Sequence, residues 1–403
     1  MPARITCVYS WPNQKRRKWL KRCTKTCSKA RNMQPIASSL TIGELAAGQA
    51  LTLPIYHFKP SGHAAGPKVY IQANVHGAEV QGNAVIFQLM KQLERCDILG
   101  EITLVPLANP LGINQKSGEF TLGRFDPITG ANWNREYLNH SIDLAAWYRE
   151  HAELSDSALI QAYRSTLVEA CQQRLRNEWG VTTGHRLAVN LQAMAHEADI
   201  VLDLHTGPKS CKHLYCPEYD LAAAQYFSIP YTLVIPNSFG GAMDEAAFCP
   251  WWQLSEVAKA QGRDLEIAVS AFTLELASQE RICLEDALVD AKGILAYLSH
   301  RGVIAERVAP AKMPRFGCYL KDYKKYHAPM AGLVEYVAPV GELLAAGETL
   351  VNLLRLDLYG SERELTALSL PQDCVPILHF ASASVHQGTE LYKVMTNLFE
   401  LPQ

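Results

Sequence analysis

The sequence lacks three features that would define its class at once: a long apolar run, a strong net charge and a disulfide framework. Its apolar stretches have the length of strands, as in Ile200–Leu204, and fall short of the roughly 20 residues that span a bilayer. Its 38 basic and 40 acidic residues give a formal net charge of −2. There is thus no global field to hold a polyanion, and we expect neither a nucleic acid nor a membrane as partner.

The cysteines are scattered rather than arranged in a framework. Cys211 and Cys216 frame a CxxxxC pattern, which is not a zinc-ribbon spacing. Reduced thiols in a cytoplasmic protein are the simplest interpretation. Of the 403 residues, 48% are hydrophobic and 19% charged, which excludes a disordered, collagen-like or disulfide-stapled chain. The length suggests about two or three domains.

The first 33 residues differ in composition from the rest, because they include many basic residues and no acidic one. Such a run can contact nucleic acid or a membrane surface, and it also has features of a transit peptide. A poorly ordered tail, or an extension ahead of a start at Met33, is the plainer interpretation. We therefore predict a basic, poorly ordered segment over residues 1–40.

From residue 68 onward, short β-rich runs alternate with helical patterns. Lys68–Val75 and Ile102–Leu107 are predicted to be buried strands, and Ala84–Leu93 between them carries apolar residues at helical spacing. Further strands are predicted at Ile200–Leu204 and within Leu265–Leu276. Strands that alternate with helices favour an α/β domain whose sheet is mixed, largely parallel and flanked by helices.

Two long segments and a change of composition complete the pattern. Residues 112–140 are rich in Gly, Asn, Asp and Pro, and predict a long loop of the kind that often carries function. Residues 141–198 are polar and helix-prone. Near Pro310–Phe316 the chain changes to short β segments with Gly and Pro turns. We predict a main domain over residues 41–315 and a small all-β, barrel-like domain over residues 316–403.

Two short motifs carry side chains that could bind a metal. The first, NVHGAE at residues 74–79, places His76 at the end of a predicted strand and Glu79 three residues later, where a helix begins. The second, DLHTG at residues 203–207, places His205 just past a buried strand. Groups at the carboxyl ends of parallel strands share one crevice, and two His with one Glu form an open catalytic zinc set. The alternative is that each histidine is incidental.

A zinc hydrolase also needs a base and a group that holds the substrate. Glu275 is the candidate base, because a carboxylate inside the apolar strand FTLEL is unfavourable without a partner. The alternative is an edge strand whose glutamate faces water. The long loop supplies Arg124, Asn134 and Arg135. An arginine can bind a carboxylate or stabilise an oxyanion, although a solvated charge is the simpler interpretation of any single one.

With these motifs the chain resembles the succinylglutamate desuccinylase/aspartoacylase family, which belongs to the zinc carboxypeptidase superfamily. The resemblance rests on NVHGAE, on ANP followed by a late NR pair, on DLHTG and on TLEL. It extends from about Thr41 to near Arg315. It implies a zinc-carboxypeptidase-like α/β fold and one zinc ion per chain, bound by His76, Glu79 and His205.

The resemblance also implies roles for the other candidates. Glu275 would be the general base, Asn134 and Arg135 would grip the carboxylate of the substrate, and Arg124 would polarise the scissile carbonyl. The β-rich tail is similar to the barrel appended to many members, and to a biotinyl/lipoyl half-motif. Because it has no carrier lysine at its turn, we expect it to cover or shape the cleft.

The sequence therefore predicts a cytoplasmic, zinc-dependent amidohydrolase that cleaves the amide of an N-acyl amino acid or a similar small carboxylate. A metallocarboxypeptidase that acts on peptide ends is one alternative. A non-catalytic zinc- or ligand-binding protein is another, which the presence of both Glu275 and Arg135 disfavours. The partner is expected to be a small molecule, and a homo-oligomer is compatible with this interpretation.

Asp244 is the candidate for substrate selection. It lies in the Gly-rich stretch GGAMDE, between the second histidine motif and Glu275. In the related carboxypeptidases the pocket for the substrate side chain is built from this part of the chain. We predict that Asp244 lines the zinc cleft and favours substrates with a cationic group, since a buried carboxylate needs a cationic partner. The alternative is a surface turn with solvated acids.

Overall fold

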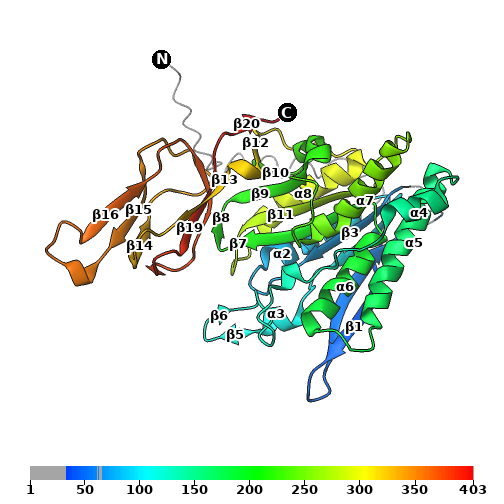
Figure 1. The fold of residues 1–403 in the computed structure, drawn as a ribbon, viewed down its shortest axis with the longest axis horizontal. Helices are drawn as coiled ribbons and strands as arrows, with labels where there is room; N and C mark the ends of the chain where they lie inside the picture. The colour runs from blue at the N-terminus through cyan, green and yellow to red at the C-terminus, as the bar shows by residue number, and fades with distance from the viewer. Residues whose placement is uncertain (1–32, 61, 63–65, 403) are drawn as a thin grey trace.

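Figure 1 shows a computed structural model of the chain, which describes residues 33–60, 62 and 66–402. Helices cover both faces of a large sheet, and the β-rich C-terminal part of the chain lies beside this sheet. Within the described residues, no helix is both long and apolar enough to cross a membrane.

The main sheet has ten strands in the order β1-β2-β4-β3-β7-β11-β9-β10-β12-β20. Its centre is parallel, because β4, β3, β7 and β11 run in one direction. The pairs β1–β2, β2–β4, β11–β9 and β12–β20 are antiparallel. The predicted fold class, a mixed and largely parallel sheet flanked by helices, is thereby confirmed. The strand bounds are β1 (Ile36–Glu44), β2 (Ala50–Phe58), β3 (Lys68–Ala73), β4 (Glu101–Val105), β7 (Ile200–Gly207), β9 (Lys212–Pro217), β10 (Tyr231–Ile235), β11 (Ser270–Ser278), β12 (Phe316–Tyr319) and β20 (Phe399–Glu400).

Two strand ends differ from the prediction in ways that matter for the motifs. The strand predicted at Lys68–Val75 stops at Ala73, because Asn74 adopts a φ of 69°, a left-handed conformation that asparagine tolerates better than most residues. The strand predicted to end before His205 continues to Gly207, since β3 and β11 flank it on both sides.

The helices lie on both faces of the sheet (Figure 1). On one face, Tyr70 of β3 belongs to the same apolar core as Leu187 of α6. On the other face, Ile71 packs in a core with Val85 of α2 and Ile294 of α8. Successive residues of a strand point to opposite faces, so β3 contributes to both cores. The helix bounds are α2 (Gln81–Leu93), α3 (Pro110–Asn114), α4 (Leu144–His151), α5 (Asp156–Leu175), α6 (Thr183–His196), α7 (Met243–Ala260) and α8 (Leu284–His300).

The segment predicted to be a long loop, residues 112–140, contains some regular structure. It holds a short hairpin of β5 (Lys116–Ser117) and β6 (Phe120–Thr121), followed by the 3₁₀ helix η2 (Trp133–Arg135). The segment also includes the end of α3, up to Asn114, and most of its other residues are irregular, as predicted.

The predicted basic segment over residues 1–40 lies mostly outside the described residues. Its last residues correct the predicted boundary, because β1 begins at Ile36 and pairs antiparallel with β2. The physical reason is burial: Ile42 of β1 and Leu53 of β2 both belong to the core beneath α4 to α7. The strand therefore starts before the predicted boundary at residue 40.

The C-terminal part forms two four-stranded antiparallel sheets, in the orders β13-β19-β17-β8 and β16-β15-β14-β18. Leu350, Leu353 and Leu391 are fully buried in the core between them. The bounds are β8 (Lys209–Ser210), β13 (Tyr323–His327), β14 (Gly332–Tyr336), β15 (Thr349–Leu354), β16 (Leu365–Ser369), β17 (Val375–His379), β18 (Ser384–Val385) and β19 (Glu390–Met395).

The boundary predicted at residue 316 does not separate the two parts. β12 and β20, at the two ends of the C-terminal segment, are strands of the main sheet. Conversely, Ser210 and Lys209 of β8 pair with Leu378 and His379 of β17 in the C-terminal sheet. Strand pairing that crosses the boundary in both directions joins the two parts, and composition alone did not reveal it.

Candidate functional site

The two sequence motifs meet at the carboxyl end of the central strands. The carboxylate of Glu79 lies between two imidazoles, with Oε1 2.9 Å from Nδ1 of His76 and Oε2 2.8 Å from Nδ1 of His205. The ring centroids of the two histidines are 5.2 Å apart. All three side chains are buried, and their ligand atoms lie within 4.8 Å of one another.

A tight turn after β3 aims His76 at this point. The side-chain amide of Asn74 donates to the carbonyl oxygens of His76 and Gly77, at 3.0 and 3.1 Å. A Cβ on Gly77 would lie 2.0 Å from the carbonyl oxygen of Gly112, so only glycine allows the turn to approach the long loop this closely. The amide of Gly77 also donates to the carbonyl of Gly123 at 2.7 Å.

The outer nitrogen of each histidine is held as well. Nε2 of His205 lies 2.8 Å from Oδ2 of Asp203, whose other oxygen accepts a 2.9 Å hydrogen bond from Gln72. Nε2 of His76 lies 2.8 Å from the amide oxygen of Asn132. An oxygen partner at Nε2 fixes the proton there and leaves the Nδ1 lone pair free for a metal, an arrangement typical of metal-binding histidines.

The charges of the cluster support each other. Burial on its own would raise the pKa of Glu79, but His76 and His205 outweigh it and hold that pKa well below its ordinary value. Burial would lower the pKa of His205, but Asp203 and then Glu79 raise it well above the ordinary value. Burial dominates at His76, whose pKa is lowered. The carboxylate is therefore ionised, as a metal ligand must be.

Glu275 lies beside this cluster on β11, a central strand rather than an edge strand. Its backbone is in register with that of His205 on β7. Burial, followed by the negative charge of Glu79, raises the pKa of Glu275 to about 7. Among the residues that the structure describes, its Oε2 has no hydrogen-bond partner although it is buried. A carboxyl group of this kind can exchange a proton near neutral pH.

Arg124 reaches the cluster from the long loop. Its Nη1 donates to Oε1 of Glu79 at 3.1 Å, and its side chain remains 46% exposed. The guanidinium is therefore bound at one end and accessible to a ligand.

Asn134 and Arg135 belong to η2, farther along the same loop. Asn134 is buried, whereas Arg135 is exposed and donates from Nη1 to the carbonyl of Asn134 at 2.7 Å. Burial raises the pKa of Tyr137 and of Tyr215, and the charge of Arg135 counteracts part of this effect at both. A Cβ on Gly241 would meet Cδ of Arg135 at 2.9 Å. The structure thus places Arg135 against the segment that leads into α7.

Asp244 lies in the first turn of α7 and is 2% exposed, so the surface-turn alternative does not apply. Burial, followed by the charge of Glu245, raises its pKa to about 7, and the charge of Asp203 contributes in the same direction. Asp244 is therefore electrostatically coupled to the residue that holds His205. Its role in substrate selection stays a prediction.

Comparison with known proteins identifies the family. The profile of the succinylglutamate desuccinylase/aspartoacylase catalytic domain matches residues 65–301, which is more than half of the chain. The chain belongs to the succinylglutamate desuccinylase/aspartoacylase family. No curated protein matches its sequence.

Solved structures of this family resemble the chain over most of its length. A candidate succinylglutamate desuccinylase/aspartoacylase from Shewanella frigidimarina NCIMB 400 is 74% identical, with a TM-score of 0.90 over 91% of this chain and 99% of that one. A family protein from Shewanella amazonensis SB2B is 73% identical, with a TM-score of 0.89 over 91% of this chain and 100% of that one. A family member from Rhodobacter sphaeroides, 19% identical with a TM-score of 0.64 over 93% and 98% of the two chains, shares the fold.

Three residues of the candidate site in the present chain were not predicted from its sequence. Asp203 was open to prediction, because it stands two residues before His205 in a strand and so shares its face. Asn132 was not, because its place depends on the course of an irregular loop. Nor was Lys393 of β19, whose charge lowers the pKa of Glu275 from the C-terminal sheet. Both act across long sequence separations.

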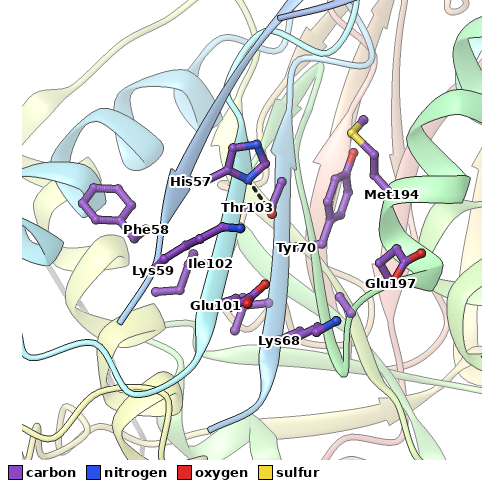
Figure 2. A pocket seen from close by; sticks show the side chains of 12 residues that line it. His57, Phe58, Lys59, Lys68, Tyr70, Glu101, Ile102, Thr103, Met194 and Glu197 are labelled. Carbon is purple, nitrogen blue, oxygen red and sulfur yellow. Dashed lines mark hydrogen bonds between the residues drawn. The ribbon is translucent and has the colours of Figure 1, made fainter. Parts of the chain in front are cut away.

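A cavity of about 220 Å³ lies at the other end of β3 and β4 (Figure 2). It is bordered by His57, Tyr70, Thr103 and several charged side chains, and Nδ1 of His57 lies 3.1 Å from the hydroxyl of Thr103. None of the predicted site residues lines it. The cavity is therefore separate from the candidate site.

Proposed function

We propose that the chain is a zinc-dependent hydrolase that cleaves the amide bond of an N-acyl amino acid or a similar small carboxylate. Family membership supports a deacylase. The single observation that carries the finer proposal is the convergence of His76, Glu79 and His205, with Glu275 on the neighbouring strand.

The donor set of the cluster fits one zinc ion. Two imidazole nitrogens and one carboxylate are the ligands that an open catalytic zinc site takes from its protein, and Asp203 and Asn132 orient both rings for it. When bound, zinc supplies a Lewis acid and lowers the pKa of water to about 7. We propose one such ion per chain.

Glu275 is the proposed general base. With a pKa of about 7, it can accept a proton from the attacking water and later donate one to the departing amine nitrogen. Its unpartnered, buried Oε2 is the atom to which we assign this transfer. The charges of His205, Arg124 and Lys393, in decreasing order of effect, keep this pKa from rising further.

The loop arginines are the proposed substrate-binding groups. Arg124, held at Glu79 and half-exposed, stabilises the negative charge that develops on the carbonyl oxygen. Arg135, exposed in η2 beside Asn134, pairs with the carboxylate of the substrate. Together they select a substrate with a carboxylate near the scissile amide.

A small substrate is favoured over a peptide by the course of the C-terminal sheet. β8 follows β7 directly and pairs with β17, and Lys393 of β19 acts on the pKa of Glu275. The C-terminal sheet therefore borders the site, as expected for a part that restricts the cleft. The cytoplasmic location and the oligomeric state stay predictions from the sequence.

The test is a hydrolysis screen of the zinc-loaded protein against N-acyl amino acids and dipeptides, with release of the free amine as readout. We expect cleavage of N-acyl amino acids, much slower cleavage by Glu275→Gln, and loss of activity with a chelator that zinc restores. Cleavage of dipeptides alone would point to a peptidase, and no cleavage of either class by folded, zinc-loaded protein would overturn the proposal.

A further inference from the structure

A second group of metal-ligating side chains lies away from the candidate active site. His140 follows η2, Cys171 lies in the last turns of α5, and His196 is the last residue of α6. One ligand atom from each lies within 4.8 Å of the other two. Cys171 and His196 are fully or almost fully buried, and His140 is half-buried.

The two imidazoles face each other through Nε2, at a distance of 2.9 Å. A separation of 2.9 Å fits an N–H···N hydrogen bond, in which one ring carries the proton and the other accepts it, and it is also close to the separation of two nitrogens that bind one metal ion. The side-chain nitrogen of Gln192 lies 3.3 Å from each Nε2. Gln192 is itself fixed by two hydrogen bonds to the backbone of Leu138.

Hydrogen bonding among the described residues engages both Nε2 atoms but not the second nitrogen of either ring. The Nδ1 atoms of His140 and His196 are buried, and neither has a partner in the part of the chain that the structure describes. A neutral imidazole is the form that offers a metal a nitrogen lone pair.

The surrounding charges admit a cation. The cationic side chain of Arg164 is in electrostatic contact with His196. Its guanidinium is paired with Asp199 at 2.6 Å and donates to the carbonyl oxygens of His196 and Ala198. A metal that binds at Cys171 displaces the thiol proton to solvent, and the resulting thiolate offsets one positive charge of the ion.

We propose that His140, Cys171 and His196 form a second metal site, which binds a zinc-class transition-metal ion through two imidazole nitrogens and one thiolate. Thiolate and imidazole ligands favour zinc or copper(I) over magnesium and calcium. Two nitrogens on one tetrahedral zinc ion lie about 3.3 Å apart, so the observed 2.9 Å separation needs to open only slightly. The half-buried side at His140 leaves a fourth position for water.

In this proposal the site has a structural role rather than a catalytic one. An ion at His140 fastens the long loop to α5 and α6. Arg135 lies five residues earlier in the same loop. Metal binding therefore limits the movement of the segment that carries the proposed carboxylate-binding residue.

Cobalt(II) is the probe for this site, because a cobalt–thiolate bond gives a charge-transfer band in the near ultraviolet that nitrogen and oxygen ligands do not give. The His76, Glu79 and His205 cluster contains no thiol, so it cannot produce the band. Other cysteines of the full chain, including Cys23 and Cys27, could contribute. The band is therefore measured by difference between variants.

We expect the cobalt-loaded full chain to lose the band in Cys171→Ala and to lose or shift it in His140→Ala. It should keep the band in Cys374→Ala, a buried cysteine of the C-terminal part, and in Glu79→Gln, which removes only the proposed catalytic ion. Zinc content should fall by one equivalent per chain in Cys171→Ala. His140→Ala changes a half-buried loop residue and serves if Cys171→Ala does not fold. Spectra and zinc content equal to those of the unsubstituted chain in both variants would overturn the proposal.

Discussion

Glu275 of β11 stands in register with His205 of β7, so the two side chains are neighbours on one face of the parallel sheet. Two residues earlier in each strand, and therefore on the same face, Thr273 is paired with Asp203. The proposed base, a proposed metal ligand and the group that orients this ligand therefore share one rigid surface. Function assigned to this surface can be tested one residue at a time.

Glu275→Gln should retain zinc and lose about 10²- to 10⁴-fold in kcat, because the amide cannot accept the proton that the base removes. Burial of the Glu275 carboxyl raises its pKa, which means that its charged form is unfavourable in the fold. Replacing it with a neutral amide should therefore not destabilise the folded protein. Zinc content and steady-state kinetics check both parts. Turnover close to that of the unsubstituted chain would remove Glu275 from the mechanism.

Asp203→Asn should weaken zinc binding by about 10- to 100-fold, the usual effect of losing the partner of a metal-binding histidine. Asp203 holds Nε2 of His205 at 2.8 Å. Competition with a chelating dye measures the affinity. The control is Asp199→Asn, just before β7, which loses an ion pair with Arg164 but should bind catalytic zinc as before. Equal affinities in the two variants would contradict the role of Asp203.

Arg135→Ala should raise KM by about 10- to 100-fold on a carboxylate substrate, the worth of a charge-assisted hydrogen bond. The effect should vanish on the carboxamide analogue of the same substrate. Arg149→Ala, which removes an exposed arginine of α4, is the matched control. A chain that cleaves the acid and its carboxamide equally well has no such carboxylate contact.

Asp244→Asn should reduce a preference for cationic over anionic substrates, and should do so more at pH 8 than at pH 6. A carboxyl group with a pKa of about 7 is mostly charged at the higher pH and mostly neutral at the lower one. Competition between a cationic and an anionic N-acyl amino acid at both values measures the preference. A clear preference of the unsubstituted chain for N-succinyl or N-acetylaspartate substrates would defeat the prediction.

Acid should destabilise the fold through His213. This histidine is fully buried, and burial lowers its pKa from 6.5 to about 4. Between these two values the unfolded state binds the proton and the folded state does not, so stability is complete above pH 6.5 and falls as the pH drops through this window. At pH 5 the loss from this group is about 2 kcal/mol.

The variant His213→Gln should therefore show a smaller difference in unfolding free energy between pH 7 and pH 5 than the unsubstituted chain. Urea titrations at the two pH values give this difference. His327→Gln, at an exposed histidine of β13, should leave it unchanged. An undiminished pH dependence in His213→Gln would assign the acid sensitivity to other groups.

Local sequence patterns were sufficient for the core of the fold. The alternation of β-rich and helical runs placed β3, β4, β7 and β11, because these strands are buried on both faces and so read as continuous apolar segments. The meeting of His76 and His205 followed from the position of their motifs at strand ends, since parallel strands bring these ends to one edge.

Contacts between segments that are distant in sequence could not be predicted from local sequence patterns. The approach of Asn132 to His76 depends on the path of an irregular loop. The pairing of Ser210 with Leu378 joins segments that carry no common pattern. The ordered start at Ile36 was masked by the basic composition ahead of it, although packing against β2 decides its structure.

The strand pairing between the two parts of the chain constrains how the protein folds during its synthesis. β8 follows the strand that carries His205, and it can pair only after β17 has been synthesised. In the same way, β12 can pair with β20 only after the chain has been synthesised up to Glu400. A ribosome must therefore release nearly the whole chain before these pairs can close, and such late, long-range pairings fold slowly. Translation that stops short of residue 399 leaves the edge at β12 unpaired, and an unpaired edge invites aggregation.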